Sequence, residues 1–270
     1  MNIIESQNRC KKYRLKILDI SQKVTALHVG GSFSCLEILD FIYFELMKKK
    51  NKNFSDTFLM SKGHGCLSQY VVLENLKILK KKDLDNYCTS KGILGCHPDY
   101  GNPGIEASTG SLGHGVGLAV GMSQADKINK IKRKIFVVIS DGELQEGSTW
   151  ENLMMAANLE LKNLIVFLDH NGSQSFGCTK VTHPKFYPIK EKILSFNWDC
   201  LEIKDGHDQN EMSRKVRSFI KNNKKPVMII CDTVKGKGVS FMENQPIWHY
   251  RSPNKIEYNL ALKELLFNER

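Results

Sequence analysis

The sequence predicts an α/β protein in which helices flank a doubly wound, mostly parallel sheet, and three observations carry this prediction. Residues 134–140 and 163–169 are short apolar, β-branched runs, the continuous pattern of strands that are buried on both faces. Residues 152–161 between them carry apolar side chains at helical spacing. Strand-like and helix-like segments alternate along the chain without a repeat or linker, which predicts one domain over residues 1–270.

The central strand–helix–strand segment predicts where a ligand binds. Parallel strands joined by a helix cross over with a right-handed sense, so both strands end at the same edge of the sheet. Asp141 follows the first strand and Asn171 lies just beyond the second. We therefore expect the two side chains to lie side by side, at the edge where open α/β sheets bind ligands.

The N-terminal part is predicted to be largely helical. A helix over residues 6–27 ends at residues 28–32, where two glycines stop it and a serine can cap the next helix, residues 35–47. A short strand follows at residues 57–61. His64 lies between two glycines in the turn after that strand, where backbone amides and the positive end of a helix dipole face a ligand.

The middle of the chain combines helices with a long loop. Helices are predicted at residues 67–79 and 82–90. Residues 92–110 are rich in glycine and proline, and long ordered loops in compact domains are often functional; this one contains His97. Residues 110–113 then open a helix whose small side chains allow close packing or the close approach of a ligand.

The C-terminal third completes the alternation of strands and helices. Residues 172–188 are predicted to form an irregular surface loop. Strands at residues 198–204 and 227–234 flank a helix at residues 210–221. A further loop leads to a terminal amphipathic helix from residue 254 onward.

Length and composition place the chain among ordinary globular proteins. It has 270 residues, 41% hydrophobic and 25% charged, enough for a sizeable core. No run approaches the roughly 20 apolar residues that a membrane span needs. The first residues also lack the apolar segment of a signal peptide. We therefore expect a cytoplasmic protein that does not associate with membranes.

The net charge of +10 raises the question of nucleic-acid binding. The excess is mostly lysine, scattered in short runs without interleaved aromatic residues, which is typical of solvated helix ends and turns. We expect no nucleic-acid partner; a basic nucleic-acid binder would instead show affinity that falls steeply with salt. The eight cysteines form no CxxC pair, which argues against a zinc site and a disulfide framework.

The residues after the two central strands suit a magnesium ion that also holds a phosphate. Mg²⁺ takes about six oxygen ligands and commonly combines one or two carboxylates with substrate phosphates. Asp141 and Asn171 offer a carboxylate and an amide, and the main-chain carbonyl of Ser173 could supply a third oxygen. Gly142 lets the backbone approach a diphosphate. An Asp-Gly pair alone is more often a plain turn, so the spacing to Asn171 carries the prediction.

This segment resembles the thiamine-diphosphate signature of the transketolase family. The matching positions are residues 140–142, 146–147, 151, 156–157, 161, 163–165 and 169–171. Four more segments resemble the family in its order: residues 28–32, residues 61–65, residues 95–97 with 108–113, and residues 205–208 with 235–238 and His249. The resemblance covers nearly the whole chain but only the family's N-terminal, diphosphate-binding domain. It implies the N-terminal subunit of a split transketolase, with the pyrimidine and C-terminal domains absent.

Residue by residue, the resemblance implies half of an active site. The implied Mg²⁺ ligands are Asp141, Asn171 and the carbonyl of Ser173. The implied thiamine-diphosphate contacts are His64, Gly110, Ser111, Leu112, Asp141, Gly142 and Asn171. The implied catalytic residues are His28, His64, His97 and His249, which bind sugar hydroxyls and move protons, and Glu146, which joins a carboxylate network with the partner domain. Taken singly, each histidine is more often a satisfied loop residue, and Glu146 an acid favoured by the helix dipole.

The resemblance implies thiamine-diphosphate- and Mg²⁺-dependent transfer of a two-carbon ketol unit between sugar phosphates. In the family the glutamate that activates the cofactor lies in the pyrimidine domain, so this chain is expected to need a separate C-terminal subunit, in a heterotetramer. The alternatives are a deoxyxylulose-phosphate synthase-like enzyme, a specialised sugar-biosynthesis ketol transferase, and a non-catalytic cofactor-binding or subunit-binding module. Departures from the family pattern at Ser111, His114, Ser140 and His170 bear more on substrate choice than on cofactor binding.

Overall fold

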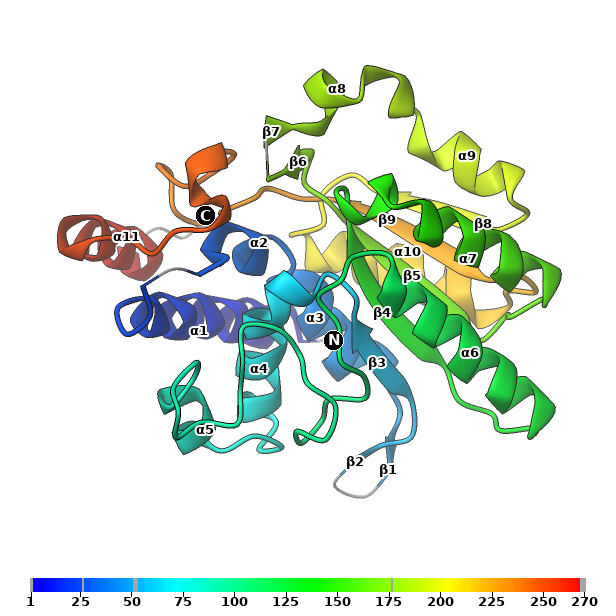
Figure 1. The fold of residues 1–270 in the computed structure, drawn as a ribbon, viewed down its shortest axis with the longest axis horizontal. Helices are drawn as coiled ribbons and strands as arrows, with labels where there is room; N and C mark the ends of the chain where they lie inside the picture. Colours follow the sequence, from blue (N-terminus) through cyan, green and yellow to red (C-terminus); the bar gives the residue numbers. More distant parts are fainter. Residues whose placement is uncertain (1, 26, 51–52, 176, 268–270) are drawn as a thin grey trace.

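A five-stranded parallel sheet forms the centre of the computed structural model, which describes residues 2–25, 27–50, 53–175 and 177–267 (Figure 1). The strand order is β3 (Thr57–Met60), β4 (Ile135–Ser140), β5 (Leu164–His170), β9 (Val227–Asp232) and β8 (Asp199–Ile203). All neighbours in this sheet are parallel. Two short antiparallel pairs join β1 (Lys49–Lys50) to β2 (Asn53–Phe54) and β6 (Ser173–Gln174) to β7 (Gly177–Cys178). The predicted fold class is confirmed.

Helices cover both faces of the sheet (Figure 1). One face packs against α1 (Ile3–Ser21), α3 (Leu36–Phe41), α4 (Cys66–Asn75) and α10 (Gln209–Lys221). The other packs against α6 (His114–Ile128), α7 (Gly147–Asn158) and α9 (Ile189–Ser195). Successive residues of β4 alternate between the two cores: Phe136 and Val138 join the first, Val137 and Ile139 the second. Burial on both faces explains why the strands appear as unbroken apolar runs in the sequence.

The N-terminal helices differ from the prediction. α1 ends at Ser21 rather than near residue 27, and position 26 lies outside the described residues. The glycine pair and serine do not stop one helix and cap the next, because they lie inside the buried helix α2 (Val29–Ser34). A Cβ built on Gly30 would lie 3.0 Å from a backbone oxygen of the C-terminal loop, so the glycine serves close packing. Tertiary burial here outweighs the low helix propensity of glycine.

Several other boundaries also move. The chain after α3 continues as a π-helical turn, η1 (Ile42–Leu46), and α5 (Lys81–Asp85) is shorter than the helix predicted at residues 82–90. Residues 92–110 are irregular, as expected. The predicted surface loop at residues 172–188 instead holds β6, β7, α8 (Thr179–Thr182) and the 3₁₀ turn η4 (Pro184–Phe186).

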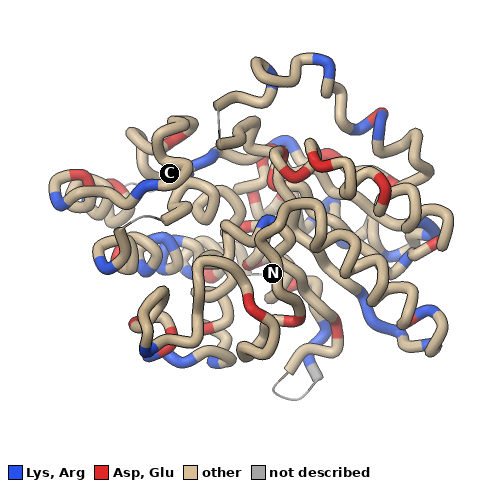
Figure 2. The backbone as a smooth tube through the Cα atoms, viewed as in Figure 1, with Lys and Arg blue, Asp and Glu red and all other residues tan. Residues whose placement is uncertain are grey.

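The terminal helix α11 (Lys255–Phe267) is present, although residues 268–270 of its predicted range lie outside the described part. It buries Ala261 and Leu265 but exposes Ile256 and Leu260, so its apolar residues do not form one buried stripe. None of the helices in the described ranges combines the length and apolarity that crossing a bilayer requires. Lys and Arg are interspersed with Asp and Glu over the outer helices and loops, as expected for solvated surfaces (Figure 2).

Candidate functional site

Asp141 and Asn171 meet at the carboxyl edge of the sheet, as the sequence predicts. The register of β4 and β5 pairs Ser140 with Asp169, so the two loops begin side by side. The backbone N–H groups of Asn171 and Gly172 donate to Asp141 Oδ2 at 2.8 and 2.9 Å. The Asn171 amide is oriented by its Nδ2, which donates to Asp169 at 3.1 Å. Its Oδ1, which accepts the N–H of the Ser173 backbone at 3.0 Å, keeps a second lone pair for another partner.

The Asp141 carboxylate is a candidate cation ligand. The residue is 1% exposed, and burial raises its pKa to about 6, although His170 opposes that shift. Within the described chain, Asp141 Oδ1 is buried without a hydrogen-bond partner. A buried carboxylate with a free oxygen is costly unless a cation compensates it, and carboxylate, amide and carbonyl oxygens suit a hard divalent ion. No three His, Cys, Asp or Glu side chains form a metal cluster within the described ranges, so cofactor phosphates would have to complete the shell.

Close-packed glycines form the loop that is expected to hold the diphosphate. Gly110 has φ +137°, and a Cβ built there would lie 2.7 Å from the His97 ring. A Cβ on Gly63, in the turn after β3, would lie 2.7 Å from the Gly110 nitrogen. At Gly142 the nearest neighbour of such a Cβ would be 3.8 Å away, which leaves room beside the backbone. Because Gly63 and Gly110 have no side chains, three segments can pack closely: the turn after β3, the His97 loop and residues 110–113.

Glu143 holds this loop in place, and the sequence analysis missed it. Its side chain is fully buried, and burial raises its pKa to about 7. Its Oε1 accepts hydrogen bonds from the hydroxyl of Ser61, after β3, and from the backbone N–H of Gly113 at 3.0 Å. Glu143 thus ties three turns together. The only sequence signal is an acid directly after the Asp-Gly pair.

Three of the four predicted histidines lie against one another. The ring centroid of His28 lies 5.2 Å from that of His64 and 5.2 Å from that of His249. The centroids of His64 and His249 are 5.9 Å apart. Burial lowers the pKa of His28 to about 3 and that of His249 to about 4, and it moves that of His64 well below its usual value. The cluster is therefore neutral at physiological pH, so its nitrogens can accept protons and donate hydrogen bonds. His97 lies against Gly110, and its charge contributes to the lowered pKa of His28.

Two buried lysines, whose roles the sequence analysis did not assign, bring positive charge to the site. Lys62 is fully buried, and its Nζ donates to Asp169 Oδ2 at 2.5 Å and to the Gly31 carbonyl at 2.8 Å. Lys235 is 3% exposed, and its Nζ lies 2.9 Å from His249 Nδ1. Burial lowers the pKa of Lys235 to about 8. Both lysines lie in the glycine-rich segments that carry the family resemblance, which was the available signal.

Glu146 and Ser111 are exposed in this chain. Glu146 precedes α7. A Cβ built on Gly113 would lie 2.8 Å from the Cβ of Glu146. The carboxylate network expected for Glu146 needs a second chain and stays a prediction.

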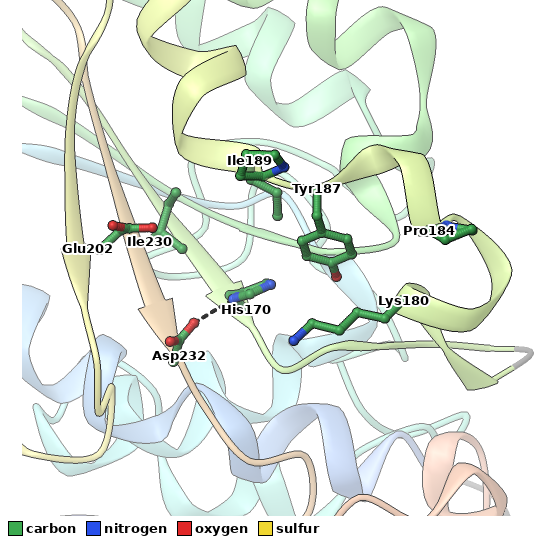
Figure 3. A pocket seen from close by; sticks show the side chains of 9 residues that line it. His170, Lys180, Pro184, Tyr187, Ile189, Glu202, Ile230 and Asp232 are labelled. Carbon is green, nitrogen blue, oxygen red and sulfur yellow. Dashed lines mark hydrogen bonds and ion pairs between the residues drawn. The ribbon is translucent and has the colours of Figure 1, made fainter.

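A cavity of about 400 Å³ lies beside His170 (Figure 3). It is lined by His170, Lys180, Pro184, Tyr187, Pro188, Ile189, Glu202, Ile230 and Asp232. His170 Nδ1 lies 2.5 Å from Asp232 Oδ1, and its Nε2 lies 3.5 Å from Asp141 Oδ1. Burial lowers the pKa of His170, but the hydrogen bond to Asp232 and the charge of Asp141 outweigh burial and raise it. His170 therefore both lines the cavity and lies close to Asp141.

The neutral histidine cluster predicts how stability depends on pH. Because His28 and His249 have lowered pKa values when folded, the unfolded chain takes up protons first as pH falls below about 6.5. Each should therefore reduce the free energy of unfolding of the cofactor-free chain by at most about 1.4 kcal/mol per pH unit until its folded pKa is reached. Urea unfolding measured between pH 7.5 and 4.5 gives the free energy of unfolding at each pH. This free energy should fall less steeply with decreasing pH in the His28→Asn/His249→Asn variant than in wild type. Equal slopes would contradict this, and His183→Asn, at an exposed position, is the control.

The comparisons with known proteins agree with this geometry. The family described as "Transketolase, thiamine diphosphate binding domain" matches residues 5–261. The chain is 36% identical over 269 residues to one subunit of the apulose-4-phosphate transketolase of Phocaeicola vulgatus, covering 98% of this chain and 95% of that protein. It is 34% identical to the 6-deoxy-6-sulfo-D-fructose transketolase subunit SqwG of Clostridium sp., covering 97% of this chain and 96% of that one.

A solved structure shows the same fold. The transketolase of Campylobacter jejuni superposes with a TM-score of 0.89 at 27% identity, covering 99% of this chain and 44% of that one. The predicted resemblance is thereby confirmed. With its family match over residues 5–261, its fold and its two relatives in agreement, this chain belongs to the transketolase family and carries the thiamine diphosphate binding domain of that family.

Proposed function

We propose that this chain is the cofactor-holding subunit of an enzyme that transfers a two-carbon ketol unit between sugar phosphates. The observation that carries the proposal is the meeting of Asp141 and Asn171 at the carboxyl edge of the sheet, where one buried Asp141 oxygen accepts no hydrogen bond within the described chain. Asp141, Asn171 and the Ser173 carbonyl would hold Mg²⁺. Gly142, His64 and residues 110–112 would hold the diphosphate of thiamine diphosphate. Similarity to transketolase subunits over nearly the whole chain supports this assignment.

The chain's own residues supply binding and proton transfer around the cofactor. Thiamine diphosphate, when bound, supplies the nucleophilic carbon that carries the two-carbon unit. Neutral His28, His64 and His249, which lie against one another, would bind sugar hydroxyls and take and return a proton. Lys235 contacts His249 and adds positive charge beside the histidine cluster. The close packing of Gly63 against Gly110 fixes the loop before the cofactor binds, which reduces the cost of ordering it.

A second polypeptide is part of the proposal. Both relatives are named as subunits of a transketolase rather than as whole enzymes, which suits a two-chain enzyme. We propose a separate C-terminal subunit with a pyrimidine domain, a heterotetramer with sites between unlike chains, and a cytoplasmic location. Glu146, exposed at the start of α7, would meet the partner there.

The two-chain proposal predicts that neither subunit is active by itself. Purified chain with thiamine diphosphate, Mg²⁺, a ketose phosphate and an aldose phosphate should form no product, because a carboxylate needed to activate the cofactor would lie on the partner. Adding the co-purifying C-terminal subunit should start ketol transfer, followed by the appearance of the new sugar phosphate. Ketol transfer by the chain alone would contradict the proposal. Chain lacking the cofactor, mixed with the partner, is the matched negative control.

The two named relatives favour a specialised sugar over a central-pathway one. One is named for apulose-4-phosphate and the other for 6-deoxy-6-sulfo-D-fructose, so subunits of this kind serve different donors. A panel of ketose phosphates and sulfonated ketoses, with pyruvate included, would identify the donor of the reconstituted enzyme. Turnover of pyruvate instead of ketoses would support a deoxyxylulose-phosphate synthase-like activity.

A further inference from the structure

Two buried atoms beside the proposed metal site face each other without a hydrogen bond. His170 Nε2 and Asp141 Oδ1 are 3.5 Å apart, and neither has a hydrogen-bond partner among the residues that the structure describes. Leaving a buried polar atom unpaired costs about 1–3 kcal/mol, so a pair of them calls for an explanation.

Asp232 determines which nitrogen of His170 faces the gap. β5 and β9 pair His170 with Asp232, and the imidazole Nδ1 lies 2.5 Å from the Asp232 carboxylate (Figure 3). A carboxylate only accepts, so Nδ1 carries a proton, and in the singly protonated ring Nε2 presents its lone pair to Asp141. The Tyr187 ring, with its centroid 5.8 Å from that of His170, packs against the imidazole on the cavity side. In that state two lone pairs face each other at 3.5 Å, so either a second proton on Nε2 or a metal ion must lie between them.

The separation of the two atoms matches that of two ligands of one metal ion. Donor atoms about 2.1 Å from a shared ion lie about 3.0 Å apart at a right angle and about 3.4 Å apart at the tetrahedral angle. A small rotation of either side chain covers the difference from 3.5 Å. Histidines that bind metals commonly donate their other N–H to a carboxylate, which orients the ring and makes the coordinating nitrogen more basic. Asp232 and His170 have that relation.

We propose that His170 is a metal ligand, with Nε2 binding the same divalent ion as Asp141, and that the site prefers a transition metal such as Mn²⁺ or Co²⁺ to Mg²⁺. The inference rests on the proposed metal-diphosphate site and adds a nitrogen to its oxygen ligands. Imidazole suits transition metals better than it suits Mg²⁺, which prefers oxygen ligands. Asp232 acts as a positioning residue, because it holds the ring through Nδ1.

Pulsed EPR of the full chain loaded with Mn²⁺ and thiamine diphosphate tests the proposal. The wild-type spectrum should show coupling of the electron spin to a directly bound imidazole nitrogen, and His170→Gln should lose it. Competition titrations should show Mn²⁺ binding at least 10-fold weaker in His170→Gln, with a smaller change for Mg²⁺. Asp232→Asn, at a position that is largely exposed and therefore tolerant, should weaken Mn²⁺ binding by about 10-fold or more. His183→Gln, at an exposed position, is the matched control.

The outcomes separate this proposal from the proposed function. Mn²⁺ and thiamine diphosphate that bind without nitrogen coupling, and equally well to His170→Gln, would overturn the ligand role while leaving the cofactor site intact. Such a result would mean that a proton, rather than a metal ion, bridges His170 and Asp141. Failure of wild-type chain and partner together to bind either ion with thiamine diphosphate would overturn the metal-diphosphate site itself, and the ligand role with it.

Discussion

Asp141→Asn is expected to abolish metal-dependent binding of thiamine diphosphate and, at the same time, to stabilise the cofactor-free chain. Asp141 is buried, and one of its oxygens has no hydrogen-bond partner in the described chain, so without a bound metal ion only His170, 3.5 Å away, offsets its charge. The asparagine oxygen can still accept the N–H groups of Asn171 and Gly172, which keeps the turn intact. The substitution removes the negative charge that binds the metal and leaves the loop connections in place.

Thermal unfolding with and without ligand separates the two effects. A ligand at 100 times its Kd stabilises a folded protein by about 2.7 kcal/mol. Wild type should show a stabilisation of this order with metal and thiamine diphosphate, whereas Asp141→Asn should show none. Without ligand, Asp141→Asn should melt at a higher temperature than wild type. A variant that binds the pair normally, or that melts lower when free of ligand, would count against the site; Glu191→Gln, an exposed acid on α9, should change neither quantity.

The strand ends were predictable because strands buried on both faces appear as unbroken apolar runs in the sequence. Once β4 and β5 are recognised, right-handed crossover alone places Asp141 beside Asn171, and the 2.8 Å contact confirms it. Small residues likewise marked the loop at Gly110, because only glycine tolerates its backbone geometry and its contact with His97. These features depend on local sequence and on general rules of chain topology.

Side-chain partners from distant segments were not predictable in the same way. No sequence rule indicates that Glu143 reaches back to Gly113 and Ser61, since the contact depends on how three turns pack. Nor does any pattern indicate that His170 turns toward Asp232, 62 positions away, because that direction follows from the register of β5 and β9. The roles proposed for the clustered histidines stay predictions, although their contact is now observed.

Lys62→Met is expected to have the largest effect on stability. Lys62 and Asp169 form a fully buried ion pair at 2.5 Å, and Asp169 also accepts hydrogen bonds from Ser34 at 2.6 Å and from Thr233. Methionine has a similar shape but leaves the Asp169 charge without its counter-ion. Breaking a buried pair by removing one partner costs about 3–5 kcal/mol, which is a large part of the typical stability of a domain. Urea unfolding of the cofactor-free chain measures the loss.

A double variant distinguishes an uncompensated charge from lost packing. If the loss comes from the charge, Lys62→Met/Asp169→Asn should recover most of it, because replacing both members of a buried pair is often nearly neutral. If packing of the lysine stem dominates, the double variant should be as unstable as Lys62→Met, and the ion-pair explanation would be wrong.

The same pair of variants also bears on the candidate metal site, because Asp169 orients Asn171 through the contact at 3.1 Å. An asparagine at position 169 can offer its oxygen to Asn171 Nδ2 and preserve that orientation. The double variant should therefore bind the metal about as well as Lys62→Met.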